Sequence, residues 1–181
     1  MKVHPTGIDG LLLLEPTKFG DDRGYFFESF NEKRFAENVG DYTFVQDNQS
    51  GSVRGVLRGL HYQLEPQAQG KLVRAVSGTV LDVAVDIRRS SPTFGKHYAV
   101  ELTGENNLQL WIPPGFAHGF VTLSDTAVFQ YKVTRYWSKD HERCIAWDDP
   151  ELGIDWKLDM APLLSAKDTQ GTRFAEADMF A

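Results

Sequence analysis

The strongest constraint on this fold is a long succession of short segments rich in aromatic and β-branched residues, separated by turn residues. We expect strands at residues 11–14, 24–30, 43–49, 56–63, 72–76, 79–87, 98–102, 109–112, 119–123 and 128–136. One segment predicts a helix, capped by Asn31, extending through Val39 and ended by Gly40. Beyond Trp147 the chain is rich in Asp, Pro and Gly, which predicts a turn-rich tail. The pattern indicates an all-β sandwich or barrel with one short helix.

The composition narrows the class of protein further. The 181 residues contain no linker or long repeat, so we expect a single domain over residues 1–181. The net charge of −6 argues against general nucleic-acid binding. No apolar run approaches the roughly 20 residues of a membrane span, and the first residues lack a secretory signal, so we expect a cytoplasmic protein. The lone Cys144 is expected to be a buried small hydrophobe.

Two motifs each end in a histidine that we place on a strand. Gly55 is followed six residues later by His61, and the segment Pro113-Pro114-Gly115-Phe116-Ala117-His118 reads Pro-x-Gly-x-x-His. The pair resembles the two motifs of the cupin superfamily, which implies a jelly-roll β-sandwich or barrel.

The chain departs from the metal-binding members of that superfamily, which use three histidines and one glutamate. Gln63 stands in the place of the second histidine, and Gln67 or Ala68 in the place of the glutamate. Two imidazoles alone make a weak metal site. We therefore expect no bound metal.

Further motifs narrow the resemblance. They are Phe19-Gly20-Asp21-Asp22-Arg23-Gly24, Gln46-Asp47-Asn48, Arg58-Gly59-Leu60-His61, Gly70-Lys71, Lys132, Glu142-Arg143-Cys144, Trp147-Asp148-Asp149-Pro150 and Leu164-Ser165-Ala166-Lys167-Asp168. Together, and in this order, they resemble the dTDP-4-dehydrorhamnose 3,5-epimerase family over nearly the whole chain. The resemblance implies a homodimer, no cofactor, and epimerisation of dTDP-4-dehydro-6-deoxy-D-glucose at C3 and C5.

The resemblance also implies four catalytic residues: His61 as base, Asp168 orienting it, Lys71 stabilising an enolate and Tyr131 as proton donor on the opposite face. Their chemistry suits the reaction, because C3 and C5 both lie α to the C4 ketone and are inverted by deprotonation and reprotonation. Strand alternation places Tyr131 on an apolar, core-facing side. Without the resemblance, the sequence would predict that Lys71 is an ordinary solvated lysine and that Tyr131 is a buried structural tyrosine.

A second implied set surrounds the nucleotide sugar: Arg23, Phe26, Glu28, Gln46, Asp47, Asn48, Arg58, Lys71, His118, Glu142 and Lys167. Arginines bind phosphate oxygens bidentately, which gives an acidic chain a local anion site. Alternation puts Arg58 and His61 on opposite faces of their strand. Either Gly59 introduces a bulge, or Arg58 acts across a subunit boundary.

Two other functions compete with this hypothesis. A related 3,4-ketoisomerase or monofunctional epimerase would share the fold, ligand and base, and Tyr131 favours the double epimerase only weakly. A non-catalytic cupin that binds a sugar is the alternative from fold alone. The combination of His61, Asp168 and Tyr131 argues against it.

Overall fold

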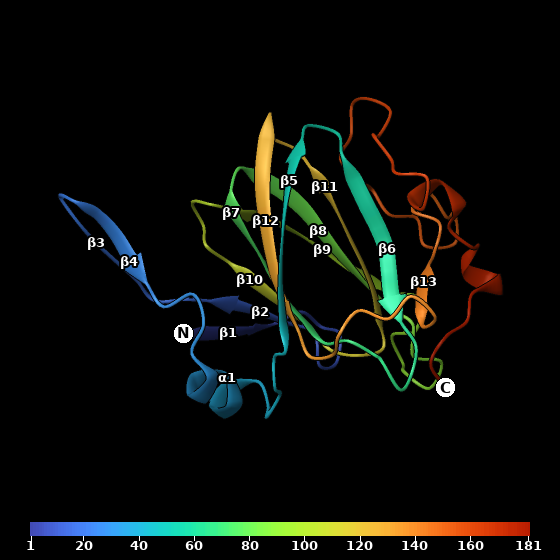
Figure 1. Ribbon diagram of the computed structural model, residues 1–181, viewed down its shortest axis with the longest axis horizontal. Coiled ribbons are helices and arrows are strands. Elements are labelled where there is room, and N and C mark those ends of the chain that lie inside the picture. The colour runs from blue at the N-terminus through green and yellow to red at the C-terminus, as the bar shows by residue number, and fades with distance from the viewer.

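The chain folds into two packed antiparallel β-sheets, a projecting hairpin, one helix and an irregular C-terminal tail (Figure 1). This computed structural model describes residues 1–181. The predicted all-β, cupin-like jelly roll is confirmed. No helix has the length and apolar character needed to span a membrane.

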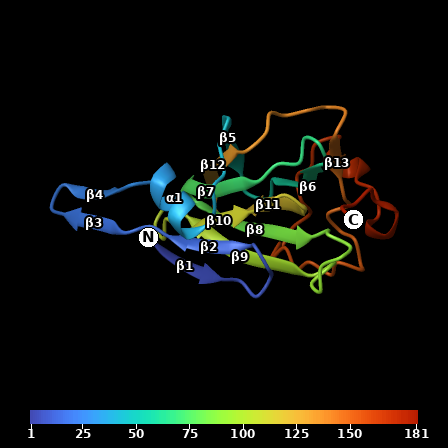
Figure 2. The same cartoon turned by 90° about the horizontal axis from the view of Figure 1, so that it is seen from below.

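The two sheets contain eleven strands. The first sheet has the order β1 (Lys2–Pro5), β2 (Leu12–Glu15), β10 (Gln109–Ile112), β7 (Lys71–Ser77), β12 (Thr126–Val133) and β5 (Gln46–Val53). The second has the order β13 (Glu142–Cys144), β6 (Leu57–Gln63), β11 (Phe116–Thr122), β8 (Thr79–Asp86) and β9 (His97–Thr103). The hairpin of β3 (Lys18–Asp21) and β4 (Gly24–Phe27) pairs with neither sheet and extends away from both (Figure 2).

Apolar side chains fill the space between the sheets. Phe129 of β12 and Phe120 of β11 stack across it with ring centroids 4.2 Å apart. The outer face of the second sheet is covered by the tail, through Trp156 and Phe174. Strands β8 and β11 are therefore buried on both faces, and buried residues follow one another along each strand rather than alternating with exposed ones.

The predicted helix is confirmed as α1 (Glu32–Asn38). The Asn31 side chain accepts a hydrogen bond from the backbone N–H of Arg34 at 3.1 Å and caps the first turn. Phe35 is the buried residue of the helix and packs edge-on against Trp111, with centroids 5.1 Å apart. Aromatic contacts of Phe35 thus hold a short helix against the outer face of the first sheet.

The strand predictions differ from the structure at the edges. They missed β1, β3 and β13, which have four residues or fewer and little apolar patterning. The strand expected at 43–49 is β5, shifted to Gln46–Val53. Phe44 packs against Phe35 of the helix instead, with centroids 5.2 Å apart, and the polar segment after it forms the sheet edge. Packing against the helix therefore outweighs the strand preference of the apolar residues.

The tail after Trp147 is turn-rich, as predicted, with two short 3₁₀ helices, η1 (Asp168–Gln170) and η2 (Phe174–Glu176). It is tied to the second sheet by a bridge between Ile145 and Thr172. The Tyr62 hydroxyl also donates a hydrogen bond to the Asp178 carbonyl. These ties hold η1 beside strand β6.

Candidate active site

A polar cavity of about 450 Å³ lies where the two sheets diverge, with an adjoining space of about 290 Å³. Strands of both sheets and the tail line it, and the two spaces share Asn48, His61, Lys71, Tyr131, Trp137 and Glu142. The size is that of sites for small organic ligands. The chain thus has one candidate active site built mainly from strand residues.

A bulge in β6 aims two predicted site residues into this cavity. The pairing of β6 with β11 shifts between Arg58 and His61, so that β6 carries one extra residue there. Gly59 lies in this step with φ +139°, and a Cβ on it would come 2.5 Å from the Cα of Gly119. Only glycine fits such a close approach. Arg58 and His61 consequently both line the cavity, as the bulge alternative required.

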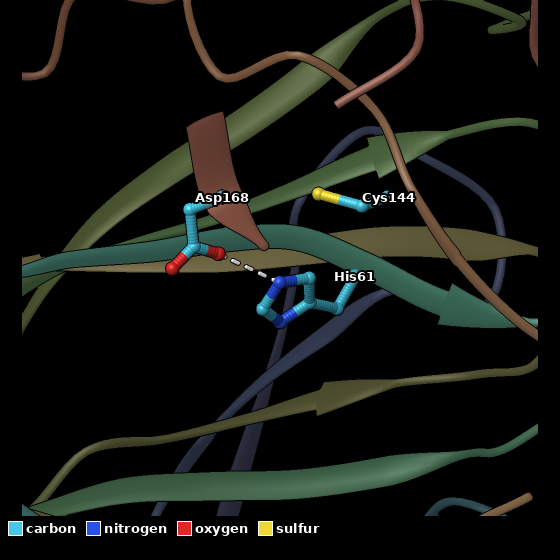
Figure 3. A group of neighbouring side chains, drawn as sticks. All are labelled: His61, Cys144 and Asp168. Atoms are coloured by element: carbon cyan, nitrogen blue, oxygen red, sulfur yellow. Dashed lines mark ion pairs between the residues drawn. The ribbon is translucent and has the colours of Figure 1, made fainter. Parts of the chain in front are cut away.

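The central feature is a close contact between a histidine of the sheet and a carboxylate of the tail. Nε2 of His61 lies 2.7 Å from Oδ1 of Asp168, in a contact that is not a well-aligned hydrogen bond (Figure 3). Asp168 also accepts hydrogen bonds from the Gly59 N–H at 3.1 Å and the Ser165 hydroxyl at 2.6 Å. Burial alone would raise the pKa of Asp168, but His61, Ser165 and Gly59 together lower it to about 2. The carboxylate is therefore charged and firmly held.

The imidazole of His61 is neutral at neutral pH. Burial lowers its pKa below 6.5, and the nearby Asp168 offsets this only in part. Since Nε2 faces the carboxylate, Nδ1 points away from it and is the nitrogen free to accept a proton (Figure 3). A neutral ring with an oriented partner is suited to general-base catalysis.

Lys71 is the first residue of β7 and is only 8% exposed, so it is not a solvated lysine. Its ammonium donates a hydrogen bond to the His61 carbonyl at 3.3 Å. Burial lowers the pKa of Lys71 to about 8, against the attraction of Asp82 and Glu142. It remains largely a cation at neutral pH, placed to stabilise a developing oxyanion.

Tyr131 of β12 has the predicted orientation, because its ring packs beside Phe129 with centroids 6.2 Å apart and it lines the cavity. Burial raises the pKa of its phenol above 10. The group is therefore a neutral hydroxyl that can donate a proton.

A second His–Asp pair lies in the same wall. His118 of β11 is directly opposite His61 in the β6–β11 register, and its Nε2 lies 2.8 Å from Oδ2 of Asp82. Both partners are buried. Sequence reasoning missed Asp82, although a carboxylate within the apolar segment Leu81-Asp82-Val83-Ala84-Val85 is itself a signal of a paired or functional group.

Most of the predicted substrate-binding residues line the cavity, namely Gln46, Asn48, Arg58, Lys71, His118, Glu142 and Lys167. Two contacts organise them: Gln46 donates to the Asn48 side chain at 2.9 Å, and Lys167 forms an ion pair with Glu142. The cavity therefore presents both cations and amide groups to a ligand.

The other predicted binding residues do not meet the cavity within one chain. Asp47 lies on the opposite face of β5, where it forms a 2.9 Å ion pair with Lys132. Arg23 and Phe26 lie on the projecting hairpin. Glu28 follows that hairpin and pairs with Arg34 at 2.8 Å. Strand alternation turns Asp47 away from the cavity. The direction of the hairpin keeps Arg23, Phe26 and Glu28 away from it.

Three further residues near the site were not among the predicted catalytic and binding residues. Trp137 and Ser165 line the cavity. Cys144 is half-buried rather than fully buried, and its sulfur lies beside His61 and Asp168 (Figure 3). Burial raises the pKa of this thiol to about 11, so it is not a nucleophile at neutral pH.

Gln63, at the place of a cupin metal ligand, has a structural role. Its amide donates to the Gln67 carbonyl at 2.6 Å and accepts from the Ser138 N–H at 2.7 Å. It also donates to the Tyr136 carbonyl at 3.2 Å. These bonds hold the loop that carries Trp137.

Comparisons with known proteins match nearly the whole chain. The family model described as dTDP-4-dehydrorhamnose 3,5-epimerase matches residues 5–176. A protein of that name from Pseudomonas aeruginosa is 61% identical, with 99% of each chain covered. An epimerase from Legionella pneumophila, solved with dTDP-4-keto-L-rhamnose, superposes with a TM-score of 0.95 at 51% identity, covering 98% of this chain and 94% of that one.

A 3'-monoepimerase from Streptomyces bikiniensis, solved with dTDP-quinovose, is more distant: its TM-score is 0.90 at 36% identity, covering 95% of this chain and 87% of that one. The fold, the cavity and the full-length matches lead to one conclusion. The chain belongs to the dTDP-4-dehydrorhamnose 3,5-epimerase family, a family of isomerases.

Proposed function

We propose that this enzyme converts dTDP-4-dehydro-6-deoxy-α-D-glucose to dTDP-4-dehydro-β-L-rhamnose, with His61 starting each inversion. The observation that carries the proposal is the 2.7 Å contact between Nε2 of His61 and Oδ1 of Asp168 at the cavity wall. The relatives named for 3,5-epimerisation support the reaction, and the full-length identity to one of them is 61%. The steps below assign each part of it to a residue.

The first step is removal of the proton on C3 or C5. Both protons are acidified by the C4 ketone, and Nδ1 of His61 accepts the proton. The imidazolium that forms is stabilised by the charged Asp168 carboxylate, whose two other donors hold it in place.

The second step is storage of the negative charge on the C4 oxygen as an enolate. The buried Lys71 ammonium stabilises that charge in surroundings with little water. No redox cofactor is required, because the carbon skeleton keeps its oxidation state throughout.

The third step is proton delivery to the opposite face. Tyr131 lies on β12 of the first sheet, while His61 lies on β6 of the second, so the two groups approach a bound sugar from different walls. The phenol gives its proton to the carbon and regains one from solvent, while His61 releases the proton that it took. Each inversion thus leaves both residues in their starting states.

The diphosphate of the substrate would interact with the cations at the cavity. Arg58 and Lys167 both line it, in a chain whose net charge is −6. An arginine fork binds phosphate oxygens bidentately. The local cations thus offset the overall negative charge.

We further propose that the enzyme is a homodimer in which the β3–β4 hairpin completes the partner's cavity. The hairpin exposes Phe19, Tyr25 and Phe26, each by more than half. A two-stranded hairpin with exposed aromatic residues is only marginally stable alone. A second copy of the chain would cover it and bring Arg23 to a bound nucleotide.

Solvent deuterium exchange tests the chemistry. With the 4-keto sugar nucleotide in D₂O, we expect deuterium at both C3 and C5. His61→Asn should abolish exchange and product formation together, whereas Tyr131→Phe should retain exchange and lose net inversion. If the Tyr131→Phe variant loses exchange as completely as His61→Asn while still binding dTDP, the assignment of base and acid is wrong. Deuterium at C3 alone would identify a monofunctional epimerase like the Streptomyces relative.

Mixing two inactive variants tests the dimer. His61→Asn lacks a base and Arg23→Ala lacks the hairpin cation, so each alone should be nearly inactive. A mixed dimer contains one site with both residues, and activity should reappear after subunit exchange. A monomer near 20.4 kDa in sedimentation, or no recovery on mixing, would contradict the shared site.

A further inference from the structure

A half-buried thiol lies beside the base and its carboxylate. A ring nitrogen of His61, Sγ of Cys144 and one carboxylate oxygen of Asp168 all lie within 4.8 Å of one another (Figure 3). They come from β6, β13 and η1, which the fold holds together: Cys144 pairs directly with His61 in the register of β13 and β6. We call these three residues the dyad–thiol cluster.

We propose that the dyad–thiol cluster is an inhibitory site for a thiophilic divalent cation such as Zn²⁺ or Cd²⁺. The inference rests on His61 as the proposed base. Imidazole, thiolate and carboxylate are the ligand types that zinc prefers, and three protein ligands with an open fourth position are typical of zinc sites that keep a water. Of its three residues only His61 stands at the place of a ligand in metal-binding cupins, whereas Cys144 and Asp168 lie outside the two cupin motifs.

The geometry needs local adjustments of about 1 Å: the sulfur, within 4.8 Å of the other two ligand atoms, must approach them, while the nitrogen and the oxygen must move apart. Ligand atoms on one tetrahedral zinc lie about 3.3–3.7 Å apart. The distance between His61 Nε2 and Asp168 Oδ1, 2.7 Å, must therefore widen by less than about 1 Å. This movement gives up the 2.7 Å contact between Nε2 and Oδ1, and the bonds of both atoms to the cation would replace it.

Asp168 is also prepared as a ligand by its surroundings. The Gly59 N–H and the Ser165 hydroxyl both donate to its carboxylate and fix its position. Such outer contacts to a ligating carboxylate strengthen metal sites.

Metal binding would stop the reaction by a defined proton movement. The cation binds Nε2, so the proton on that nitrogen moves to Nδ1, the atom that otherwise accepts the substrate proton. The thiol of Cys144 loses its proton to solvent as the metal–sulfur bond forms. The imidazole ring of His61 stays neutral overall, but Nδ1 no longer has a free lone pair with which to accept the substrate proton.

The chain suits a direct test, because Cys144 is its only cysteine. Cd²⁺ added to the metal-free wild-type protein, kept reduced with a phosphine, should produce a thiolate-to-cadmium absorption band that saturates at one equivalent per chain. Cys144→Ser should show no such band. Absence of the band in the wild-type protein would overturn the proposal, whether or not the protein epimerises the sugar.

Activity measurements then connect binding to inhibition. Chelator-treated wild-type enzyme should be fully active, lose activity with Zn²⁺, and regain it when chelator is restored. Cys144→Ser should keep its basal activity and need at least about tenfold more Zn²⁺ for half inhibition. Equal sensitivity of the two proteins would overturn the proposal.

Two controls separate this site from surface binding. His4 and Glu15 form an exposed pair at 2.9 Å, and His4→Gln removes it without touching the cavity. The sensitivity of activity to Zn²⁺ should be unchanged in this variant. A loss of sensitivity would show that the inhibitory zinc site is at this surface pair and not in the cavity. Mg²⁺, which prefers oxygen ligands, should not inhibit, and inhibition by it would contradict a thiolate site.

Discussion

Two His–Asp pairs lie side by side in the cavity wall, and they are built differently. His61 and His118 are direct cross-strand neighbours, and each faces a carboxylate at 2.7–2.8 Å. The His61 side chain is 26% exposed and that of His118 only 7%. The accessible ring is the one that can exchange protons with a ligand.

The two carboxylates differ more than the two rings. Asp168 keeps the Gly59 and Ser165 donors if its histidine is removed. Asp82 has only His118, since its Oδ1 is buried with no hydrogen-bond partner. We infer that the His61 pair is arranged so that proton transfer leaves the structure intact, while the His118 pair maintains the wall.

The largest expected effect separates these roles by removing each imidazole. His61→Ala should lower kcat by about three orders of magnitude or more, with a small loss of stability, because Asp168 keeps its other donors. His118→Ala should lower the free energy of unfolding by about 3 kcal/mol, because it leaves the Asp82 carboxylate buried without a partner.

Steady-state kinetics and urea denaturation of both variants check this prediction. His4→Gln is the matched control for loss of a histidine outside the cavity. If His118→Ala is as stable as the wild type, or His61→Ala is the less stable of the two, the contrast between the pairs is wrong.

A smaller effect concerns the acid stability that Asp168 provides. Its pKa is about 2 in the folded protein and 3.8 in the reference state, so its charged form adds stability that is fully present above pH 3.8. That contribution, about 2 kcal/mol, is lost as the pH falls towards 2. Asp168→Asn should therefore flatten the dependence of unfolding free energy on pH across this range.

Asp86 provides the comparison for this measurement. Burial raises its pKa, but hydrogen bonds from Arg88, Ser91 and Thr93 lower it to about 2 overall. Asp86→Asn should flatten the same pH range, and only Asp168→Asn should also lose the activity that depends on an oriented imidazole. If the unfolding free energy of Asp168→Asn depends on pH as steeply as that of the wild type, the pKa assigned to Asp168 is wrong.

The smallest effect tests whether the two pairs communicate through Lys71. Burial lowers the pKa of Lys71 to about 8, and the charge of Asp82 partly opposes this. Activity should therefore fall as the pH rises through about 8, when the ammonium loses its proton. Asp82→Asn removes the opposing charge and should move this alkaline limb to lower pH.

The pH profile of kcat/KM for the wild type and Asp82→Asn measures the shift. The arginine of Lys71→Arg stays charged at this pH. Any activity that this variant retains should therefore not fall as the pH rises through about 8. An alkaline limb that stays at the same pH in Asp82→Asn would show that the second pair does not act on Lys71.

Local sequence patterns predicted the local structure well. The cap by Asn31, the apolar alternation of β12 and the turn-rich tail depend on neighbouring residues, and each was found. The family resemblance also pointed to the cavity residues His61, Lys71 and Tyr131. The position of β5 was less predictable, because packing of Phe44 on α1 moved the strand along the sequence.

Other parts of the site depend on contacts that periodicity does not describe. The bulge at Gly59 turns Arg58 and His61 to one side, and it depends on the close approach of Gly119. The direction of the β3–β4 hairpin separates Arg23 from the cavity of its own chain. Both are decided by how strands pack.

Local patterning, and motifs in order along the chain, were sufficient to predict the fold class, the family and the residue types available for catalysis. Which of these groups meet depends on how the strands and the tail pack. This packing brings Asp168 to His61 across more than one hundred positions, pairs Asp82 with His118, and puts the Cys144 sulfur beside the base. The physical reason is that these contacts are made between strands and the tail, where distance in space is independent of separation in sequence.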